Sequence, residues 1–216
     1  MNDIRELSRL ASPAPKPQSL ASDGTTLWMG SRATRRIYAI GPSTWTVGWE
    51  TAAPGTPWGM TVVGRELRVI CGETAEDNRI IRRCVPREGF DREFALPCPD
   101  DTGSHLGWNG RHLHLSQWYP KKLLTLGVDG KVERVIQVPH GICGQVIVDG
   151  VFYLATTDDE ETTNYWVTRV DPRGATPKID DLARIPFAAR ALAFDGRVFW
   201  TNHRERDQIV SFARPD

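Results

Sequence analysis

A β-hairpin pattern occurs five times along the chain at nearly regular intervals. Each copy has a short apolar run, a turn that contains glycine and a second apolar run, as two tightly joined antiparallel strands do. The copies are LASDGTTLWMG from Leu20, MTVVGRELRVI from Met60, LGWNGRHLHLS from Leu106, VIVDGVFYLAT from Val146 and LAFDGRVFWTN from Leu192. Their turn glycines, at positions 24, 64, 110, 150 and 196, are separated by 40, 46, 40 and 46 residues. The chain is therefore built from one repeated unit, which limits the folds open to it.

Each hairpin is followed by further strand patterns. A third strand is predicted at IYAI, IIRRC, LLTL, VTRV and IVSF, and a fourth at WTVGWE, FDREFAL, VERVIQV and IDDLARI. The last unit has no fourth strand, but IRELSRL at residues 4–10 has the form of the missing one. Five four-stranded units closed by the opposite end of the chain predict an all-β, five-bladed β-propeller of antiparallel blades. A β-sandwich of similar hairpins explains neither the regular spacing nor the terminal strand.

The repeat predicts a single propeller domain over residues 1–216. Its approximate blades are 18–53, 57–97, 104–139, 144–186, and 190–216 together with 1–13. Since a closed ring leaves no sheet edge that demands a partner, the sequence leaves the oligomeric state open.

Charge and composition exclude several classes of partner. The 27 basic residues balance the 27 acidic ones, so we expect no nucleic-acid partner and no membrane partner. The first residues, MNDIRELSRLASP, lack the apolar core of a secretory signal, and we expect a cytoplasmic protein. The four cysteines show no CxxC spacing, which favours reduced, inert thiols.

In a propeller the loops that lead into the first strands meet at one mouth of the central channel, where a small-molecule ligand can bind. We predict His105, His140 and His203 as candidate acid/base residues there. The predicted ligand-binding residues are Gln18, Trp58, Arg190, Trp118 and Gln145. Structural alternatives are that Trp58 plugs the channel, that His105 is a hydrogen-bonded core histidine, and that Arg190 pairs with a carboxylate.

The blade pattern resembles small quinoprotein-like propellers, and in blade number it is most similar to the five-bladed glutamine cyclotransferases. PQSLASDG at 17–24 resembles that family's Gln-Gly-Leu start of a first strand, and PWGMT at 57–61 resembles its Trp-Gly-Leu-Thr start. The resemblance implies a site at the channel mouth in which a buried carboxylic acid and aromatic walls cyclise an N-terminal glutamine. The family's acid belongs to a Glu-Gly start of a channel strand, and no first strand of this sequence has one.

A second resemblance is to streptogramin (virginiamycin B) lyase, on Pro139-His140-Gly141-Ile142 and TPWGMTVVG. That seven-bladed family uses a histidine and a magnesium ion in an elimination, which implies a role for His140 and leaves room for a divalent metal. We expect no other cofactor. His112 and His114 also have a spacing that can bind metal. Position 114, however, matches Trp28 and Trp200 of sister units, which favours packing between blades.

Two functional hypotheses follow. The first is a small-molecule-binding propeller, with lyase- or cyclase-type chemistry at the channel mouth. The alternative is a non-catalytic propeller that binds a protein or peptide through Trp118, Tyr119 and the segment 158–164. No P-loop, GxSxG, HExxH or dinucleotide-binding motif points to another chemistry.

Overall fold

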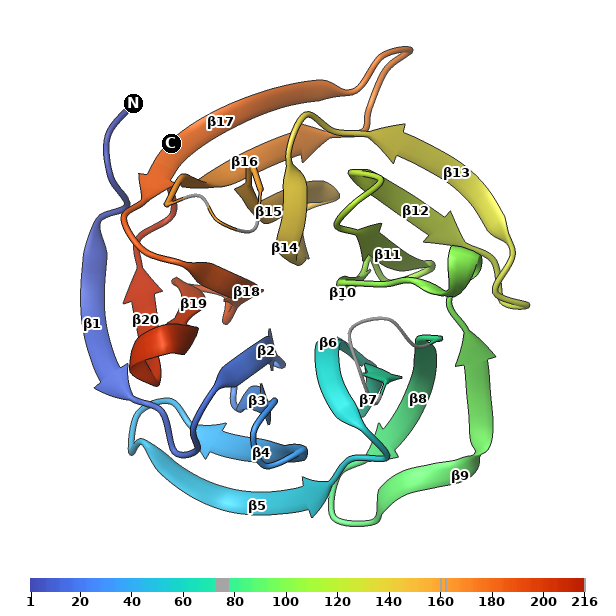
Figure 1. The fold of residues 1–216 in the computed structure, drawn as a ribbon, viewed down its shortest axis with the longest axis vertical. Coiled ribbons are helices and arrows are strands. Elements are labelled where there is room, and N and C mark those ends of the chain that lie inside the picture. The colour runs from blue at the N-terminus through green and yellow to red at the C-terminus, as the bar shows by residue number, and fades with distance from the viewer. Residues whose placement is uncertain (73–77, 160, 162, 216) are drawn as a thin grey trace.

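The computed structural model describes residues 1–72, 78–159, 161 and 163–215, which form five four-stranded antiparallel sheets around a central axis (Figure 1). The predicted all-β, five-bladed propeller is therefore confirmed. Blade 1 contains β2 (Pro17–Ser22), β3 (Leu27–Ser31), β4 (Arg36–Gly41) and β5 (Thr46–Ala52). Blade 2 contains β6 (Thr56–Val63), β7 (Glu66–Gly72), β8 (Ile80–Val85) and β9 (Gly89–Pro97).

Blades 3 to 5 follow the same order from the axis outward. Blade 3 contains β10 (His105–Trp108), β11 (Leu113–Gln117), β12 (Lys122–Leu126) and β13 (Val132–Gln137). Blade 4 contains β14 (Gly141–Val148), β15 (Val151–Thr157), β16 (Tyr165–Asp171) and β17 (Lys178–Ile185). Blade 5 contains β18 (Ala189–Phe194), β19 (Phe199–His203), β20 (Gln208–Phe212) and, outermost, β1 (Glu6–Ala11). The 3-10 turns η1 (Pro99–Asp101) and η2 (Arg204–Arg206) complete the elements.

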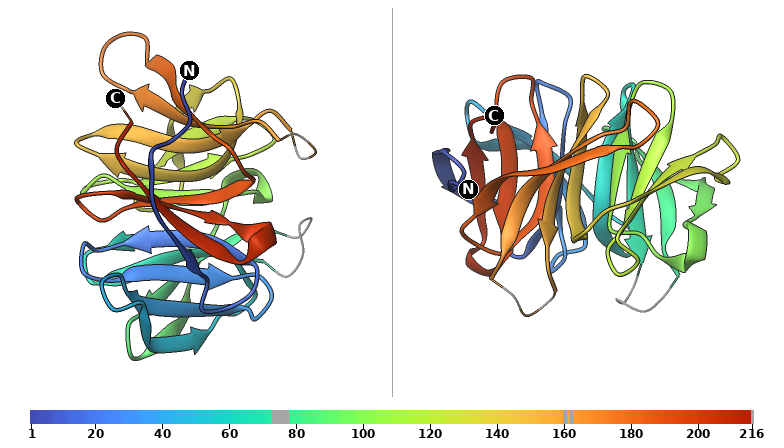
Figure 2. Two further views of the ribbon diagram at one scale, coloured as in Figure 1. Left: turned by 90° about the vertical axis from the view of Figure 1, so that its left-hand side faces the viewer. Right: turned by 90° about the horizontal axis from the view of Figure 1, so that it is seen from above.

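The N-terminal strand closes the ring, as the sequence predicts. β1 pairs antiparallel with β20, with Glu6 opposite Phe212 and Ala11 opposite Gln208. The segment before β1 also contacts blade 4, because the backbone N–H of Ile4 donates a 2.8 Å hydrogen bond to the carbonyl of residue 184 in β17. Both termini lie at this seam between blades 4 and 5 (Figures 1 and 2).

The hairpin turns account for the recurring Asp-Gly pairs. The Asp195 carboxylate accepts hydrogen bonds from the backbone N–H groups of residues 197 and 198, and from the Trp200 indole at 2.7 Å. Asp23 binds its own turn in the same way and accepts from the Trp28 indole at 3.1 Å. The glycine that follows each aspartate has a positive φ, which glycine adopts without steric cost. Turn chemistry and inter-blade tryptophans are therefore parts of one local motif.

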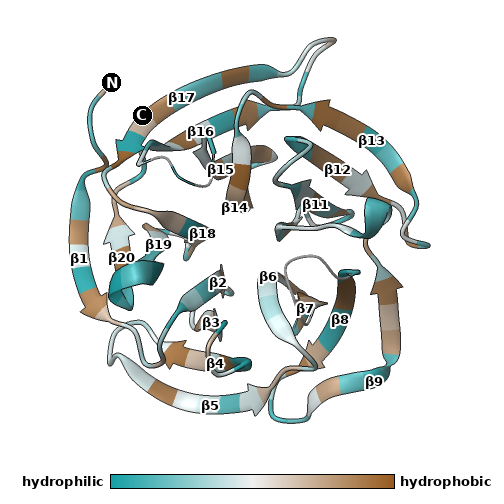
Figure 3. Ribbon diagram, viewed as in Figure 1, coloured by the Kyte–Doolittle hydropathy of each residue, from teal (hydrophilic) through white to brown (hydrophobic). Residues whose placement is uncertain are grey.

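Apolar side chains fill the spaces between neighbouring blades, whereas the outer strands alternate polar and apolar residues (Figure 3). Phe199 and Phe212 are fully buried between blades 4 and 5. His114 packs edge-on against Phe152 of blade 4 at 4.9 Å between ring centroids, which confirms the packing role predicted for its position. No helix in the described ranges is long and apolar enough to cross a membrane.

Candidate functional site

Four of the five inner strands carry a β-bulge at the mouth, the end of the axis at which the inner strands begin. In β2, β6 and β14 the extra residue is Gln18, Trp58 or Cys143, and in β18 the irregularity includes Arg190. A bulge changes the direction of a side chain that regular pleating would point elsewhere. In blade 3 the corresponding residue is Ser104, directly before β10. Each blade therefore contributes one side chain to a ring around the mouth.

This ring lines a cavity of about 410 Å³. Residues between the second and third strands of four blades complete its wall, namely Arg32, Arg79, Trp118, Tyr119 and Arg204. Four arginines line the cavity, and no aspartate or glutamate in the described part of the chain does so. The mouth is therefore suited to an anion.

Arg190 is held at the mouth by its backbone. Its N–H donates a 2.8 Å hydrogen bond to the Asn202 side chain, whose amide in turn donates to the carbonyl of Pro17 in blade 1. The guanidinium lies 3.8 Å from the Cys143 sulfur and 5.7 Å from the centroid of the Tyr165 ring. Its Nε has no hydrogen-bond partner, and it forms no ion pair with a described carboxylate. The structural alternative for Arg190, a fixed carboxylate partner, is thus absent from the described residues.

Arg204 stands beside Arg190 and is partly neutralised. Its Nη1 donates to the Gln18 side chain at 2.9 Å, and its Nε donates to Glu205 at 3.1 Å. The pKa of Arg204 is lowered, first by burial and then by the positive charge of Arg190, with a smaller effect from Arg32. Like charges therefore repel each other at this side of the mouth.

Trp58 supports two of the arginines. The Arg79 guanidinium lies 4.0 Å from its ring centroid and that of Arg32 lies 5.1 Å away, both within cation–π range. Arg79 is buried and also donates to the carbonyl of Gly103 at 3.3 Å. Trp58 lines the cavity, and its ring contacts two guanidinium groups.

Trp118 and Tyr119 form an aromatic wall on the side of blade 3. Their rings meet edge to face with centroids 4.7 Å apart, and Tyr119 is 70% exposed. Trp118 lies directly over Gly141, where an added Cβ would come within 2.8 Å of the indole. The absence of a side chain at residue 141 therefore lets the indole pack against the start of β14.

β14 contributes Cys143 to the wall of the mouth cavity. It is buried, and burial raises the pKa of its thiol, although the nearby charge of Arg190 acts in the opposite direction. The other three cysteines do not line the mouth cavity, and burial raises the pKa of each to about 12. Cys143 is therefore protonated at neutral pH and lies at the ligand-accessible end of the axis.

His105 lies one residue below the mouth ring and does not line the cavity. It is 1% exposed, its Nδ1 is 3.0 Å from the carbonyl oxygen of Leu106, and its Nε2 has no partner among the described residues. Burial lowers its pKa to about 4. The ring is therefore neutral at physiological pH, as in a core histidine.

The other two predicted acid/base residues lie outside the cavity wall. His140 is held between Asp158 and Asp181, each 3.2 Å from one ring nitrogen, and it stacks on Trp166. His203 stacks on the Phe187 ring at 5.1 Å, and burial lowers its pKa. The structure therefore does not bring the three histidines together at the mouth.

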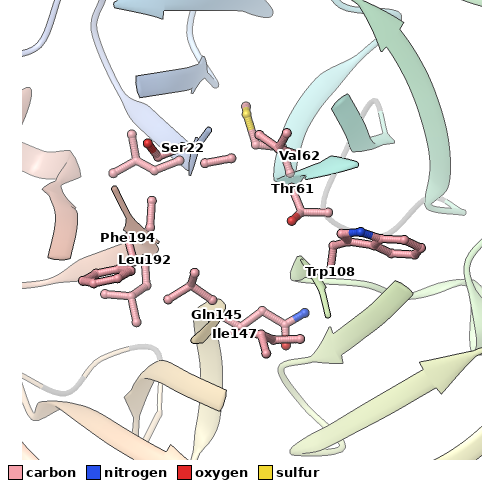
Figure 4. Close-up of a pocket in the computed structure, with 13 residues that line it drawn as sticks. Ser22, Thr61, Val62, Trp108, Gln145, Ile147, Leu192 and Phe194 are labelled. Atoms are coloured by element: carbon pink, nitrogen blue, oxygen red, sulfur yellow. The ribbon is translucent and has the colours of Figure 1, made fainter. Parts of the chain in front are cut away.

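Gln145 belongs to a second, smaller cavity at the far end of the axis, where the inner strands finish (Figure 4). Its side-chain N–H₂ donates to the carbonyls of His105 and His114 at 3.2 and 2.8 Å. The far cavity, about 140 Å³, is lined mainly by apolar side chains such as Leu192, Phe194 and Ile147. Gln145 thus joins neighbouring blades inside the channel and does not line the mouth cavity.

The resemblance to the lyase family left a divalent metal open, and the described ranges contain no cluster of side chains that could bind one. No group of three or more His, Cys, Asp or Glu side chains among those residues could hold a metal ion. Both ring nitrogens of His140 already face carboxylates. We therefore derive no chemical step through a metal.

Four of the eight predicted site residues line the mouth, namely Gln18, Trp58, Trp118 and Arg190. Cys143 was missed because counting back from the turn glycine places Gly144 opposite Trp58. Gly150 is the second residue of its two-residue turn, whereas Gly64 is the first residue of its turn, so the count is one residue too high in blade 4. Arg32, Arg79 and Arg204 follow or precede strands in separate blades. Only a loop-by-loop comparison of basic residues could have indicated that they converge.

No family model matches this sequence, and no curated protein matches it. Solved structures do match over the whole chain. Myxococcus xanthus glutaminyl cyclase aligns with a TM-score of 0.73 and 13% identity, covering 100% of this chain and 99% of that one. A Bacteroides thetaiotaomicron protein of unknown function aligns with a TM-score of 0.59 and 12% identity, over 99% of this chain and 72% of that one.

A third similar structure is the PQQ-bound aldose sugar dehydrogenase of Streptomyces coelicolor, with a TM-score of 0.56, 12% identity and 98% coverage of both chains. At these identities the comparisons show a shared propeller fold. The architecture expected from the resemblance to glutamine cyclotransferases is thus confirmed. Function has to be argued from the residues of the mouth.

Proposed function

We propose that the protein binds a small anionic molecule in the mouth cavity and acts on it as an enzyme of the lyase or cyclase type. The observation that carries this proposal is Arg190, a cavity-lining guanidinium without a described carboxylate partner. A partly buried cation is unfavourable unless an anion accompanies it. The shared fold with a glutaminyl cyclase supports an enzymatic role.

The mouth has groups that suit such chemistry. Eliminations and cyclisations build up negative charge in the transition state, which fixed guanidinium groups stabilise. A thiol that stays protonated at neutral pH can donate a proton, and the Cys143 sulfur lies 3.8 Å from Arg190 Nη1. An anionic group bound by Arg190 would therefore lie next to a proton donor.

The alternative, a surface for a protein or peptide, has less support. Among the exposed large apolar side chains of the described residues, Tyr119 is the one that lines the mouth. In the segment 158–164, residues 160 and 162 lie outside the described part of the chain. Protein interfaces usually need a wider apolar centre than one tyrosine supplies.

The test is a thermal-shift screen of the full chain against carboxylates, phosphates, matched neutral amides, a peptide with N-terminal glutamine, and PQQ, which one structural neighbour binds. A ligand at about 100 times its Kd adds roughly 2.7 kcal/mol, or about 5–10 °C in Tm at this chain length. We expect anions, and not their neutral amides, to raise Tm. Compounds that do so are then incubated with the protein, and cyclised or eliminated products are sought by mass spectrometry.

Two variants locate the site. Arg190→Gln should abolish the shift, whereas Arg197→Gln should keep it, because Arg197 is an exposed residue in the β18–β19 turn of the same blade. If no anion shifts Tm, or if both variants respond as the wild type does, the mouth is not an anion site. Binding without turnover of any compound would remove the enzymatic part of the proposal.

A further inference from the structure

The charges around the mouth are distributed unevenly. Blades 5 and 1 supply Arg190, Arg204 and Arg32, and blade 2 supplies Arg79, which stacks on Trp58, whereas blade 3 supplies Trp118 and Tyr119. The cavity therefore has a cationic side and an aromatic side. A ligand that fits both sides has negative charge at one end and an apolar body at the other.

Two of these cations lack a counter-ion. Neither Arg32 nor Arg190 forms an ion pair with a described residue. The Arg32 guanidinium lies over the Trp58 ring, and the Arg190 guanidinium lies near the Tyr165 ring and the Cys143 sulfur. Arg204 is different, because it shares the Glu205 carboxylate with Lys16. Two uncompensated positive charges thus face one cavity.

The electrostatic coupling between the arginines connects them into one binding site. Burial and the positive charges of Arg190 and Arg32 lower the pKa of Arg204, so both of these arginines lie close enough to Arg204 to act on its charge. One negative charge can pair with only one of these two guanidinium groups. Two negative charges would balance Arg32 and Arg190 together.

We infer that the natural ligand is a small dianion with an apolar or aromatic body, its two negative charges directed at Arg32, Arg190 and Arg204 and its body at Trp118. This inference rests on the proposed function and narrows its ligand class. The shared chemistry is a doubly charged oxyanion, which either a phosphate ester or a dicarboxylate provides. Guanidinium groups bind both with paired hydrogen bonds. A cavity of about 410 Å³ has the volume of roughly 14 liquid waters at about 30 Å³ each, which is enough for one substituted ring.

The experiment is isothermal titration of the full chain at pH 7.5 and constant ionic strength. The probes are phenyl phosphate and phthalate as dianions, benzoate as a monoanion, benzamide as a neutral ring, and inorganic phosphate as a dianion without a body. We expect at least one aromatic dianion to bind about tenfold or more tightly than benzoate, and more tightly than inorganic phosphate. Preference for phenyl phosphate indicates a phosphate ester, and preference for phthalate indicates a dicarboxylate.

Variants test the assignment of the two charges. Arg32→Gln should reduce the preference for dianion over monoanion to about threefold or less, because one of the two unpaired cations is removed. Arg35→Gln is the matched control, since Arg35 is exposed in the same β3–β4 turn and does not line the cavity. Trp118→Leu should weaken phenyl phosphate and leave inorganic phosphate unchanged. Circular dichroism establishes that each variant is folded.

Three results would overturn the inference. If benzoate binds as tightly as the dianions, the site takes a monoanion, and the proposed function survives while this inference fails. If inorganic phosphate binds as tightly as phenyl phosphate, the aromatic body has no role. If no anion binds and benzamide does, both the dianion and the proposed anion site are wrong.

Discussion

Neighbouring blades approach each other very closely at Gly144, and this yields a quantitative prediction for Gly144→Ala. A Cβ at this position would lie 2.4 Å from the backbone nitrogen of Leu192, and 2.5 and 2.7 Å from the carbonyl carbon and Cα of Ala191. These are backbone atoms, so no side chain can rotate away. Since non-bonded atoms need about 3.5 Å, β14 and β18 must separate by roughly 1 Å.

The ring makes this separation costly. Blades 4 and 5 are also joined at the seam by the segment before β1, so a shift of β14 is resisted on both sides. Overpacking of this kind typically costs about 1–3 kcal/mol, and we expect the upper end of that range because backbone opposes the methyl group. For a chain of this length, about 3 kcal/mol lowers Tm by roughly 6–12 °C.

The assay is thermal and urea unfolding followed by circular dichroism, with Gly48→Ala as the matched control. An added Cβ at Gly48, in β5, meets nothing within 4 Å. The control should therefore be neutral or stabilising by about 0.5–1 kcal/mol, because alanine loses less backbone entropy than glycine. Gly144 also adjoins Cys143, so the variant should weaken anion binding at the mouth.

If Gly144→Ala unfolds within about 0.5 kcal/mol of the wild type, the inner strands have more freedom than the distances at Gly144 imply. The ring of inner strands would then not be rigid. Equal stability of the two alanine variants would be equally decisive against it.

Three further predictions concern the ring, its buried histidines and the mouth. Deleting residues 1–12 should lower Tm by more than about 10 °C, because β20 is left with an unpaired edge, and an unchanged Tm would refute closure by β1. Burial lowers the pKa of His105 and His114 to about 4, below the unfolded value of about 6.5. Between about pH 4 and pH 6.5 the unfolded chain therefore binds more protons than the folded chain. The contribution of the two neutral histidines to the free energy of unfolding is fully present above about pH 6.5 and is lost towards pH 4, with a slope of up to about 2.7 kcal/mol per pH unit in urea titrations. Replacing both histidines with glutamine should flatten that slope, and an unchanged slope would contradict the assignment. Because burial raises the pKa of the Cys143 thiol, it should alkylate more slowly than free cysteine. Its rate with iodoacetate relative to iodoacetamide should nevertheless be about tenfold higher than for free cysteine, because the arginines attract the anion, and Arg190→Gln should remove that gain; a ratio equal to that of free cysteine, measured by peptide mass spectrometry, would refute the cationic mouth.

The repeat was sufficient to predict the fold because its signals are local. The Asp195 and Asp23 turns bind their own backbone and a tryptophan five residues later, so each hairpin is specified within about ten residues. The missing fourth strand was matched at the other terminus by pattern alone, and β1 pairs with β20 as expected.

The site was predicted only in part because its geometry depends on one-residue irregularities. Gln18, Trp58 and Arg190 were found because they lie near the start of inner strands, where the repeat places the mouth. Cys143 was not found, because Gly150 lies one residue later in its turn than Gly64 does, so that the count points to Gly144. The histidines were predicted because imidazole can act as an acid or base near neutral pH. Burial decides the protonation state, and His105 is buried below the mouth ring and therefore neutral.

The sequence by itself therefore determined the number of blades, their strand order and the closure by the N-terminal strand, since period, turn residues and apolar alternation are properties of short segments. Only the tertiary structure decided which side chains meet at the mouth. Arg32 and Arg204 come from loops of different blades and Arg190 from the irregular start of β18, and they meet because blades 5 and 1 are neighbours in the ring. Charge that is spread evenly along the sequence becomes concentrated in one cavity because the ring brings distant loops together.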